Sequence, residues 1–488
     1  MNKKILFALI LILAVSFAVR LYKIDNPIAD WHSWRQADTA VVARNFYKYG
    51  YNPFLPKYDD MSGVAENPVP NPGRYRFVEF PIYNSTVYLA YALNGGVREE
   101  LARLITVFIS LGSLVMVYLL SRRYFGEKTA LLSALLFGIL PYSIYYSRVI
   151  LPDPLLVFAS LGFLYFLDGW IWQNKSYQLI WGLIFLAMAF LTKPMAIFYF
   201  LPLVYSYYKK EGKFWPIPKR YWVIALGFIP FLGWRVWIQQ HPEGIPASKW
   251  LFNGNGIRFR PAFFQWIVGD RFGTEILGVT GTFLFLLGVL KRPFEKEGWL
   301  LYLLALSSIA YLFVFATGNV QHDYYQILII PALCIFLARG AVLLFRGIEG
   351  FVPRIWTIPL ALLFLFLAIY LPWLDVKGLY QINNPVIVEA GREADAILPK
   401  SAVVIAPYNG DTSFLYQTNR YGWAFVAMPI PEMIKRFGVT SFVSVAEDAQ
   451  TKWVERNYSV LEKTPGFVIV DLTKPNMSAN PLMDPEPK

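Results

Sequence analysis

Long apolar runs recur along this chain from Ile5 to Leu374, separated by short polar segments. Many of the runs are close to the roughly 20 residues that an α-helix needs to cross the hydrocarbon core of a bilayer. This alternation predicts a mainly α polytopic membrane bundle of about eleven spans. We expect the spans near residues 5–22, 101–120, 129–147, 154–171, 177–192, 194–208, 221–237, 274–290, 298–316, 325–345 and 355–374.

Two long segments interrupt this pattern on the side where the first span ends. Residues 23–97 far exceed an ordinary connection of about 4–6 residues, and loops of that length tend to be functional or disordered. Disorder is not expected, because Ala37–Tyr49 and Phe80–Leu93 both have an apolar helical face. We expect the second stretch to lie on the membrane or to dip into it. Another long loop runs from residue 239 to about 273.

After Leu374 the pattern changes to alternating helical and strand periodicity. We expect helices near 385–398 and 433–437, and strands near 402–406, 441–445 and 467–472, which together predict a small soluble α/β domain. The proline-rich end after Thr473 is expected to be a mobile tail. The predicted domains are therefore a membrane part, residues 1–375, which includes the loop 23–97, and an extracytoplasmic α/β domain, residues 376–488.

Composition and charge agree with a membrane protein. The chain is 56% hydrophobic and only 16% charged, whereas soluble proteins carry about 25% charged residues. The turns predicted to be cytoplasmic hold sixteen basic and five acidic residues, which accounts for nearly all of the net charge of +12. This asymmetry predicts a multi-pass protein with a cytoplasmic N-terminus, and eleven crossings put the C-terminal domain outside. No nucleic-acid partner is needed to explain the charge, and no nucleotide-binding glycine motif is present.

The first span and the single cysteine each have one simple interpretation. The apolar run after MNKK continues to Val19 and ends at Arg20-Leu21-Tyr22 without a small-x-small cleavage site, which favours a retained span over a cleaved signal peptide. Cys334 is the single cysteine of the sequence and lies inside a predicted span. Without a second cysteine, no intramolecular disulfide can form.

The stretch DWHSWRQADTAVVARNF, residues 30–46, concentrates polar groups just after the first span. An interfacial aromatic belt with snorkelling arginine explains Trp31, Trp34 and Arg35. It does not explain Asp38, which opens the predicted helix. Asp38 is either an N-cap or a carboxylate with a chemical role.

Three further ionisable residues fall on the same, outer side. Glu79 follows Arg74 and Arg76 at the start of the second amphipathic stretch, Asp153 lies between two prolines in ILPDPLL, and Lys193 lies in a two-residue turn in FLTKPMA. Asp153 could cap its helix, and Lys193 could neutralise the carbonyl groups at a helix end. The placement of Asp38, Glu79, Asp153 and Lys193 on one face favours a functional site.

The order of these motifs resembles that of the GT-C glycosyltransferases. It consists of a first span, an Asp-led helix ending in A-R-x-F, E-x-P, R-x-x-x-x-D, T-K-x and a late H-x-YY segment. WRQADTA…ARNF is similar to the bacterial branch related to protein O-mannosyltransferases and to the lipid A aminoarabinose transferase (family 39-like). The resemblance covers residues 1 to about 345 and, more loosely, the C-terminal domain.

The resemblance implies an enzyme that moves a hexosyl or pentosyl group from a polyprenyl-phosphate carrier to an acceptor hydroxyl on the outer face. The acceptor would be a lipid, glycan or protein. The carbohydrate chemistry would fall to Asp38, Glu79 and Asp153, with Asp38 as the catalytic carboxylate. The residues implied in substrate binding are Lys193, Arg35, Arg74, Arg76, Arg148, His322, Tyr324 and Tyr325.

This chain departs from the family pattern at several positions. Thr39 replaces a second acid after Asp38, and Phe80 replaces a lysine that would bind phosphate. Arg74, Arg76 and Arg148 are the candidates to supply the missing cation. The residues call for no cofactor except a divalent metal, which some relatives carry and for which Glu79, His241 and His322 are the candidate ligands.

Two other classes of protein compete with an enzyme. A transporter or flippase of lipid-linked sugars would show internal repeats and broken helices near the bilayer midplane, but the sequence has no repeat and its polar groups gather at one face. A membrane scaffold does not explain Asp38, Asp153 and Lys193 together.

Overall fold

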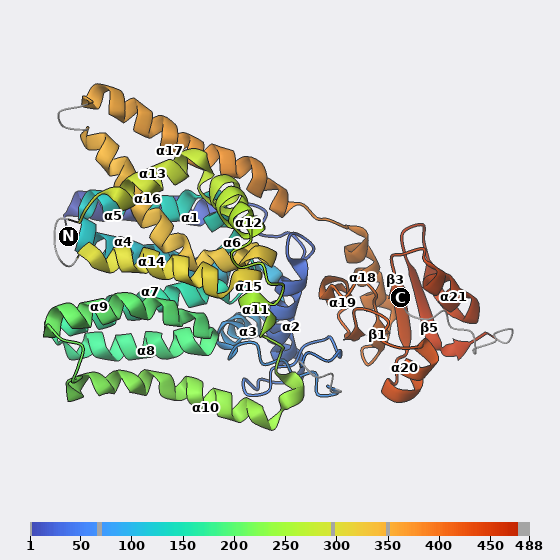
Figure 1. Cartoon of the computed structure of the whole chain (residues 1–488). Coiled ribbons are helices and arrows are strands. Elements are labelled where there is room, and N and C mark those ends of the chain that lie inside the picture. Colours follow the sequence, from blue (N-terminus) through green and yellow to red (C-terminus); the bar gives the residue numbers. More distant parts are fainter. Residues whose placement is uncertain (1, 66–70, 294–297, 348–351, 477–488) are drawn as a thin grey trace. The chain divides into compact units, whose positions relative to one another are not determined.

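The computed structural model describes residues 2–65, 71–293, 298–347 and 352–476. The chain divides into two compact units (Figure 1). The helical unit comprises Met1–Ile24, Arg103–Trp237 and Ser248–Leu379, and the α/β unit comprises Asp25–Ala102, Ile238–Ala247 and Tyr380–Lys488. The expected mobile tail lies outside the described residues from 477 onward, but Thr473 itself belongs to a strand that ends at Pro475.

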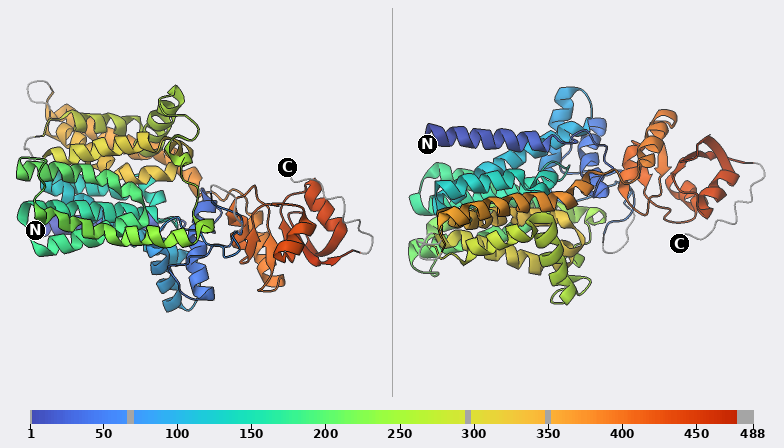
Figure 2. Two further views of the ribbon diagram at one scale, coloured as in Figure 1. Left: turned by 60° about the horizontal axis from the view of Figure 1, so that its bottom comes forward. Right: turned by 90° about the horizontal axis from the view of Figure 1, so that it is seen from above.

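The helical unit is built from apolar helices whose long members run alongside one another (Figure 2). Their bounds are α1 Lys3–Arg20, α4 Glu99–Phe125, α5 Glu127–Ile139, α6 Pro141–Tyr146, α7 Asp153–Gln173, α8 Ser176–Thr192, η1 Pro194–Tyr199, α9 Phe200–Glu211, η2 Lys219–Phe228, α10 Ile229–Trp237, α11 Trp250–Asn253, α12 Pro261–Phe264, η5 Gln265–Ile276, α13 Gly278–Leu290, α14 Trp299–Val314, α15 Ala316–Gln321, η7 Asp323–Ile329, α16 Ile330–Arg346, α17 Arg354–Val376 and η8 Lys377–Tyr380.

Five helical segments within the described ranges are long and apolar enough to cross a membrane: Glu99–Phe125, Asp153–Gln173, Lys219–Gln240, Asp323–Arg346 and Arg354–Tyr380. The pair Pro261–Ile276 and Gly278–Leu290, which bends by 107°, has the length and apolarity of either a broken sixth span or a re-entrant loop. The other expected spans coincide with shorter helices or with helices interrupted at proline, as at Pro141 and Pro194. The mainly helical membrane-type fold is confirmed, while the count of eleven spans stays a prediction.

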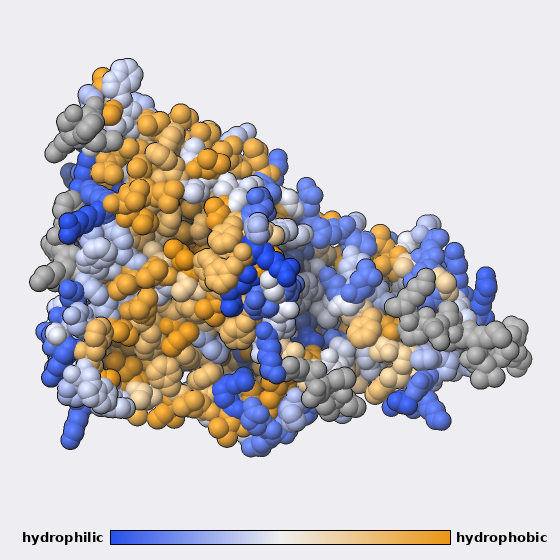
Figure 3. All heavy atoms as spheres, viewed as in Figure 1, coloured by the Kyte–Doolittle hydropathy of each residue, from blue (hydrophilic) through white to orange (hydrophobic). Residues whose placement is uncertain are grey.

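The outer surface of the helical unit is apolar, as a surface facing lipid should be (Figure 3). Phe7, Val236, Leu290 and Trp356, on four different helices, are each at least 69% exposed. In water such a surface would be a strong aggregation liability. The exposure therefore supports a bilayer as the solvent of this unit.

Close helix packing holds α13 against α16. A Cβ atom added to Gly288 would lie 1.9 Å from the carbonyl oxygen of Phe336, and one added to Gly340 would lie 1.9 Å from that of Leu284. Small residues permit such backbone contact between membrane helices. The contact fixes α16, and with it η7, which carries Tyr324 and Tyr325 immediately before α16.

The α/β unit contains a five-stranded sheet of order β2-β1-β3-β5-β4. The strands are β1 Val403–Ile405, β2 Tyr421–Trp423, β3 Ser441–Ser444, β4 Tyr458–Lys463 and β5 Val468–Pro475. β2, β1 and β3 are parallel, and β5 pairs antiparallel with both β3 and β4. The other elements of this unit are α2 Ser33–Tyr49, α3 Ile82–Asn94, η3 Ile238–Gln240, η4 Pro242–Gly244, α18 Val386–Ile397, α19 Thr412–Gln417, α20 Ile430–Phe437 and α21 Ala449–Asn457.

Alternating side chains of the sheet build two small cores. Val404 packs in a cluster with residues of α18 and α19, whereas its neighbour Ile405 packs in a second cluster with residues of α20 and α21. Successive residues of a strand point to opposite faces, so the apolar segment at 402–406 serves both clusters. The predicted elements at 385–398, 402–406, 433–437, 441–445 and 467–472 all match observed ones.

The long loop after α1 is part of the α/β unit. The amide of Met61 donates to the carbonyl of Gly422 (2.7 Å), and the amide of Gly422 donates to the carbonyl of Asp59 (2.9 Å), which extends the sheet beyond β2. Gly422 has φ +156°, and a Cβ there would lie 1.8 Å from the carbonyl oxygen of Val404. Residues 25–102 and the C-terminal segment thus fold together. The division at residue 376 into a membrane part and an outer domain stays a prediction.

Candidate functional site

Asp38 lies inside α2 rather than at its start. The helix begins at Ser33, its N-cap is His32 in the left-handed region (φ 52°), and no side chain caps it. The N-cap interpretation of Asp38 is therefore wrong, because the polar sequence Ser-Trp-Arg-Gln already forms the first turn. Asp38 is only 5% exposed, so its carboxylate needs buried partners.

Two side chains hold the Asp38 carboxylate in a fixed orientation. Nη1 of Arg76 donates to Oδ2 at 2.7 Å, and the hydroxyl of Thr412 donates to Oδ1 at 2.8 Å. Burial raises the pKa of Asp38 above its ordinary value, while the guanidinium groups of Arg76 and Arg35 act in the opposite direction. The result is a carboxylate that is more basic than an exposed aspartate and already oriented.

A second carboxylate shares Arg76 with Asp38. Nη2 of Arg76 donates to Oδ2 of Asp60 at 3.3 Å. The hydroxyl of Thr39 donates instead to the backbone carbonyl of Arg35. Asp60, some twenty residues further along the chain, therefore places a second carboxylate on Arg76, whereas Thr39 makes a local contact within α2.

Glu79 and Arg35 form a buried ion pair. Nη2 of Arg35 lies 3.2 Å from Oε1 and 3.1 Å from Oε2 of Glu79, and both side chains are almost completely buried. Arg35 thus does not snorkel toward an interface. The pair fixes the start of the second amphipathic stretch against α2.

Arg74 is directed to a different acid. Its Nη1 lies 3.6 Å from Asp59, which also accepts from Arg44 at 2.6 Å, and its guanidinium lies 4.2 Å from the ring centroid of Tyr421. Among the arginines expected to replace the missing cation, Arg76 is the one that contacts Asp38.

The candidate metal ligands do not form a ligand set. Nδ1 of His241 lies 3.6 Å from Glu243, and its ring packs against Tyr75. Glu79 pairs with Arg35, and the ring of His322 packs edge-on against Trp250. In the part of the chain that the structure describes, no three His, Cys, Asp or Glu side chains gather as a metal site would require.

A second cluster of expected residues lies in the helical unit. Asp153 is the first residue of α7 and makes no capping hydrogen bond; Nζ of Lys193 donates to its Oδ1 at 2.6 Å. Both side chains are more than nine-tenths buried. The side chain of Lys193 is thus directed to Asp153 rather than to the carbonyl groups that end α8. Oδ2 of Asp153 has no hydrogen-bond partner within the described ranges.

Aromatic rings complete this second cluster. Nζ of Lys193 lies 5.1 Å from the ring centroid of Tyr325 and 5.8 Å from that of Tyr324. The ring of His322 stacks on Tyr324 with centroids 5.5 Å apart. Arg148 is fully buried and donates to the backbone carbonyl of Lys23 at 2.7 Å. The expected residues therefore form two groups, one in each unit.

Sequence reasoning missed Thr412 and Asp60. Thr412 lies 374 positions from Asp38 in the chain, in a six-residue helix too short to show periodicity. Asp60 follows Asp59 in a polar loop, and only the paired acids distinguish that position. Neither the short helix at Thr412 nor the pair of acids at Asp59 and Asp60 indicates a position close to Asp38.

Comparisons with known proteins agree with the architecture and the motifs. A family model described as dolichyl-phosphate-mannose-protein mannosyltransferase matches residues 81–237. The crystal structure of ArnT from Cupriavidus metallidurans bound to undecaprenyl phosphate is 14% identical, with a TM-score of 0.60 over 95% of this chain and 97% of that one. Archaeal oligosaccharyltransferase AglB from Archaeoglobus fulgidus, in complex with an inhibitory peptide and a dolichol-phosphate, is 12% identical, with a TM-score of 0.54 over 94% and 72%.

The fold is that of the GT-C membrane glycosyltransferases, so the resemblance predicted from the motifs is confirmed. Among curated proteins, an uncharacterized protein of Aquifex aeolicus is 30% identical over 156 residues, which is 32% of this chain. The match spans about a third of that relative's length, 35%.

Proposed function

We propose that this protein is an integral-membrane glycosyltransferase that moves a sugar from a polyprenyl-phosphate donor to an acceptor hydroxyl at the outer face of a bacterial inner membrane. The observation that carries the proposal is the buried Asp38 carboxylate, oriented by Arg76 and Thr412 and made more basic by burial. The GT-C fold supports it, since one solved structure of that fold is bound to undecaprenyl phosphate and another to a dolichol-phosphate.

In the proposed reaction, Asp38 is the general base. The acceptor oxygen attacks the anomeric carbon of the donor sugar, and its proton passes to the Asp38 carboxylate as the new C–O bond forms. The bond from the anomeric carbon to the phosphate oxygen breaks, and polyprenyl phosphate leaves with the bonding electron pair. The two hydrogen bonds to Asp38 use two of the about four lone-pair positions of the carboxylate, which leaves positions for the acceptor proton.

The leaving phosphate needs positive charge rather than a proton. Lys193 has three donors and makes one hydrogen bond to Asp153 within the described ranges. It can therefore bind a phosphate oxygen as well, while Asp153 holds the ammonium in place. In a site shielded from water, such a cation stabilises the charge that develops as the bond breaks.

The proposal is tested with the purified full chain and a panel of polyprenyl-phosphate hexoses and pentoses, with membrane lipid extract as the source of acceptors. Release of free polyprenyl phosphate is the readout. We expect release by the wild type and its loss in Asp38→Asn, with an unchanged melting temperature because Arg76 keeps Asp60 as a partner.

Asp60→Asn is the matched control, because it removes the other carboxylate bound to Arg76 and leaves the base in place. This variant should retain transfer. Near-normal release by Asp38→Asn would refute the assignment of the base. Movement of intact donor across a bilayer without release would favour the transporter alternative.

A further inference from the structure

Tyr58 lies beside the Asp38 site, in the long segment between α2 and α3, and its backbone is held in place. Its amide donates to the carbonyl of Arg74 at 2.8 Å, and its own carbonyl accepts from Nη1 of Arg74 at 3.1 Å. Two residues later, Asp60 pairs with Gly422 in a β-bridge. Tyr58 is therefore fixed by the sheet edge, although it belongs to no helix or strand.

The ring of Tyr58 packs on the guanidinium group that orients the proposed base. The guanidinium carbon of Arg76 lies 4.6 Å from the ring centroid. Nη1 of the same group donates to Oδ2 of Asp38 at 2.7 Å. Tyr58 is only 3% exposed. The phenol and the carboxylate thus contact one and the same guanidinium group.

The charged groups around the phenol are paired with one another. Burial raises the pKa of Tyr58; of the nearby charges, Arg35 and Arg76 lower it, while Glu79 and Asp38 raise it. The phenol therefore lies among the Arg35–Glu79 and Arg76–Asp38 ion pairs and stays protonated at neutral pH. A protonated phenol can both donate and accept a hydrogen bond.

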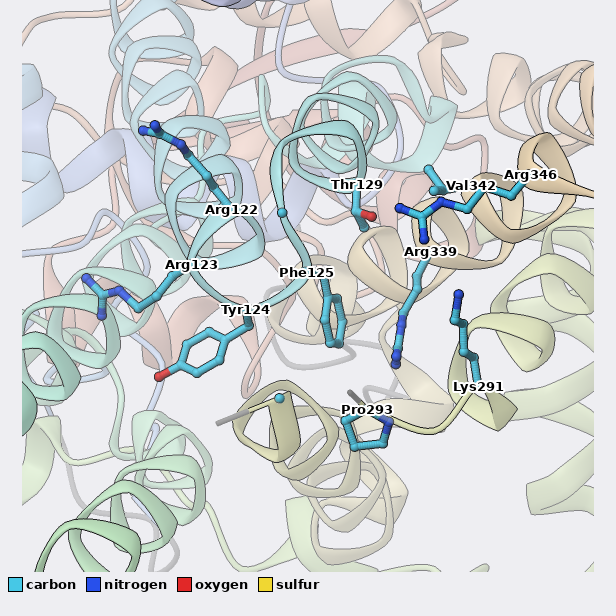
Figure 4. A pocket seen from close by; sticks show the side chains of 12 residues that line it. Arg122, Arg123, Tyr124, Phe125, Thr129, Lys291, Pro293, Arg339, Val342 and Arg346 are labelled. Atoms are coloured by element: carbon cyan, nitrogen blue, oxygen red, sulfur yellow. The ribbon is translucent and has the colours of Figure 1, made fainter. Parts of the chain in front are cut away.

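The hydroxyl of Tyr58 has no hydrogen-bond partner among the described residues. Buried tyrosines usually direct the hydroxyl to a partner, and others in this chain do so. Tyr199 donates to the carbonyl of Leu328 at 2.7 Å. Tyr124, drawn in Figure 4, donates to Oδ2 of Asp168 at 2.7 Å. The hydroxyl of Tyr58 is therefore available to a bound molecule.

We propose that the hydroxyl of Tyr58 hydrogen-bonds to a hydroxyl group of the donor sugar. This inference rests on the proposed glycosyl transfer and names a sugar contact for it. The acceptor oxygen must come within about 2.6–3.2 Å of Asp38 to give up its proton, so the anomeric carbon that it attacks lies beside Asp38. A sugar in that place is within reach of Tyr58, because both side chains contact Arg76.

The chemistry of the phenol fits a sugar better than a phosphate. A sugar hydroxyl donates and accepts, as a neutral phenol does, whereas an ionised phosphate oxygen only accepts and is bound best by a cation. The competing interpretation is that Tyr58 only supports Arg76 by stacking on it. Tyr58→Phe separates the two, since phenylalanine keeps the ring and removes only the hydroxyl.

The experiment measures binding rather than turnover, so that it does not depend on transfer. The full chain carrying Asp38→Asn is titrated with undecaprenyl phosphate and with its mannose, glucose and arabinose derivatives. The ratio of the affinity for a sugar-bearing lipid to the affinity for undecaprenyl phosphate isolates the contribution of the sugar. Adding Tyr58→Phe should lower this ratio about tenfold for the best-bound sugar, as the loss of one hydrogen bond does. Affinity for undecaprenyl phosphate and the melting temperature should not change.

Tyr421→Phe is the matched control. The ring centroid of Tyr421 lies 4.2 Å from the guanidinium carbon of Arg74, which pairs with Asp59 rather than with Asp38. This variant removes the same hydroxyl from the same kind of stack and should leave the ratio unchanged. Monodeoxy forms of the best-bound sugar identify the partner: one of them should bind about tenfold more weakly and should be insensitive to Tyr58→Phe.

Two results would overturn the proposal. An unchanged ratio in Tyr58→Phe would show that the hydroxyl makes no sugar contact. An equal loss of affinity for undecaprenyl phosphate and for its sugar derivatives would show that Tyr58 acts only through the structure of the site. Failure of the proposed transfer is seen separately, as a wild-type protein whose sugar affinity depends on Tyr58 but which releases no polyprenyl phosphate.

Discussion

Replacing Thr412 by Val tests whether the C-terminal segment sets the basicity of Asp38. Valine has nearly the shape of threonine but no hydroxyl, so Oδ1 of Asp38 loses its 2.8 Å hydrogen bond while Arg76 still holds Oδ2. The N-cap of α19 is Asp411, whose side chain accepts from the amide of Ser413. The start of the helix therefore survives the substitution.

The size of the effect follows from the charge on the acceptor. A hydrogen bond to an ionised group contributes about 1.5–3 kcal/mol, and one pKa unit corresponds to about 1.4 kcal/mol. Because the lost bond stabilises the ionised form, the pKa of Asp38, already raised by burial, should rise by a further one to two units, as estimated from these two magnitudes. If transfer needs ionised Asp38, the acidic limb of the pH–rate profile should move to a correspondingly higher pH. Much of the plateau rate should be retained.

Stability should respond to pH in the same sense. A carboxyl whose pKa is raised on folding contributes stability that is fully present below its unfolded pKa and is lost as the pH rises through its folded pKa. The lost bond to Thr412 adds to the cost of holding Asp38 ionised. The melting temperature of the valine variant should therefore fall further below that of the wild type at alkaline pH than at acidic pH.

The assay is the pH profile of kcat/KM for polyprenyl phosphate release, recorded beside melting curves. Thr412→Ser is the control, since it restores the hydroxyl without the methyl group and should restore the wild-type profile. A valine variant that melts earlier but keeps the wild-type acidic limb would show that Thr412 only packs against α2, and would refute the reasoning.

Three further predictions concern other parts of the chain. Lys193→Ala should weaken donor binding and slow transfer, whereas Lys193→Arg should keep part of both, because the charge remains but its geometry differs; unchanged donor affinity in the alanine variant, measured by lipid binding, would contradict the phosphate role. Gly422→Ala should lower the free energy of unfolding by on the order of 3 kcal/mol, because the new Cβ meets the carbonyl of Val404 at 1.8 Å; Gly96→Ala, which meets nothing within 4 Å, serves as its control in the same melting assay. A fluorescent protein that matures only in the cytoplasm, fused after Lys488, should stay dark, and a bright fusion would show that the number of spans is even.

The elements that the sequence predicted are those whose burial repeats along the chain. α18 buries a regular helical face, and β1 lies in an unbroken apolar segment buried on both sides of the sheet, so a helical period and an apolar run locate them within a residue or two. β2, with three residues, and α19, with six, are too short for any period, and tertiary pairing alone decides their structure. The start of α2 was predicted four residues late, because Trp34 and Arg35 match the composition of a membrane interface.

The candidate site was predictable only as far as residue type allows. A carboxylate beside an apolar helix is unusual enough to single out Asp38, and a lysine between two apolar runs is unusual enough to single out Lys193. Their partners are decided by chain folding: Arg76 turns toward Asp38, while Arg74, two residues earlier, turns toward Asp59. No sequence pattern distinguishes these two arginines.

The contact between Asp38 and Thr412 has a consequence for biosynthesis. Asp38 leaves the ribosome well before Thr412, the group that completes its surroundings, which follows 374 positions later. Until β1, β2 and α19 have been made and have paired with the segment around Met61, the carboxylate lacks the hydrogen bond from Thr412 that fixes its second oxygen. Sugar transfer that depends on this carboxylate would begin only after the segment that carries Thr412 has folded, so a chain that stops before this segment would occupy the membrane without consuming its lipid donor.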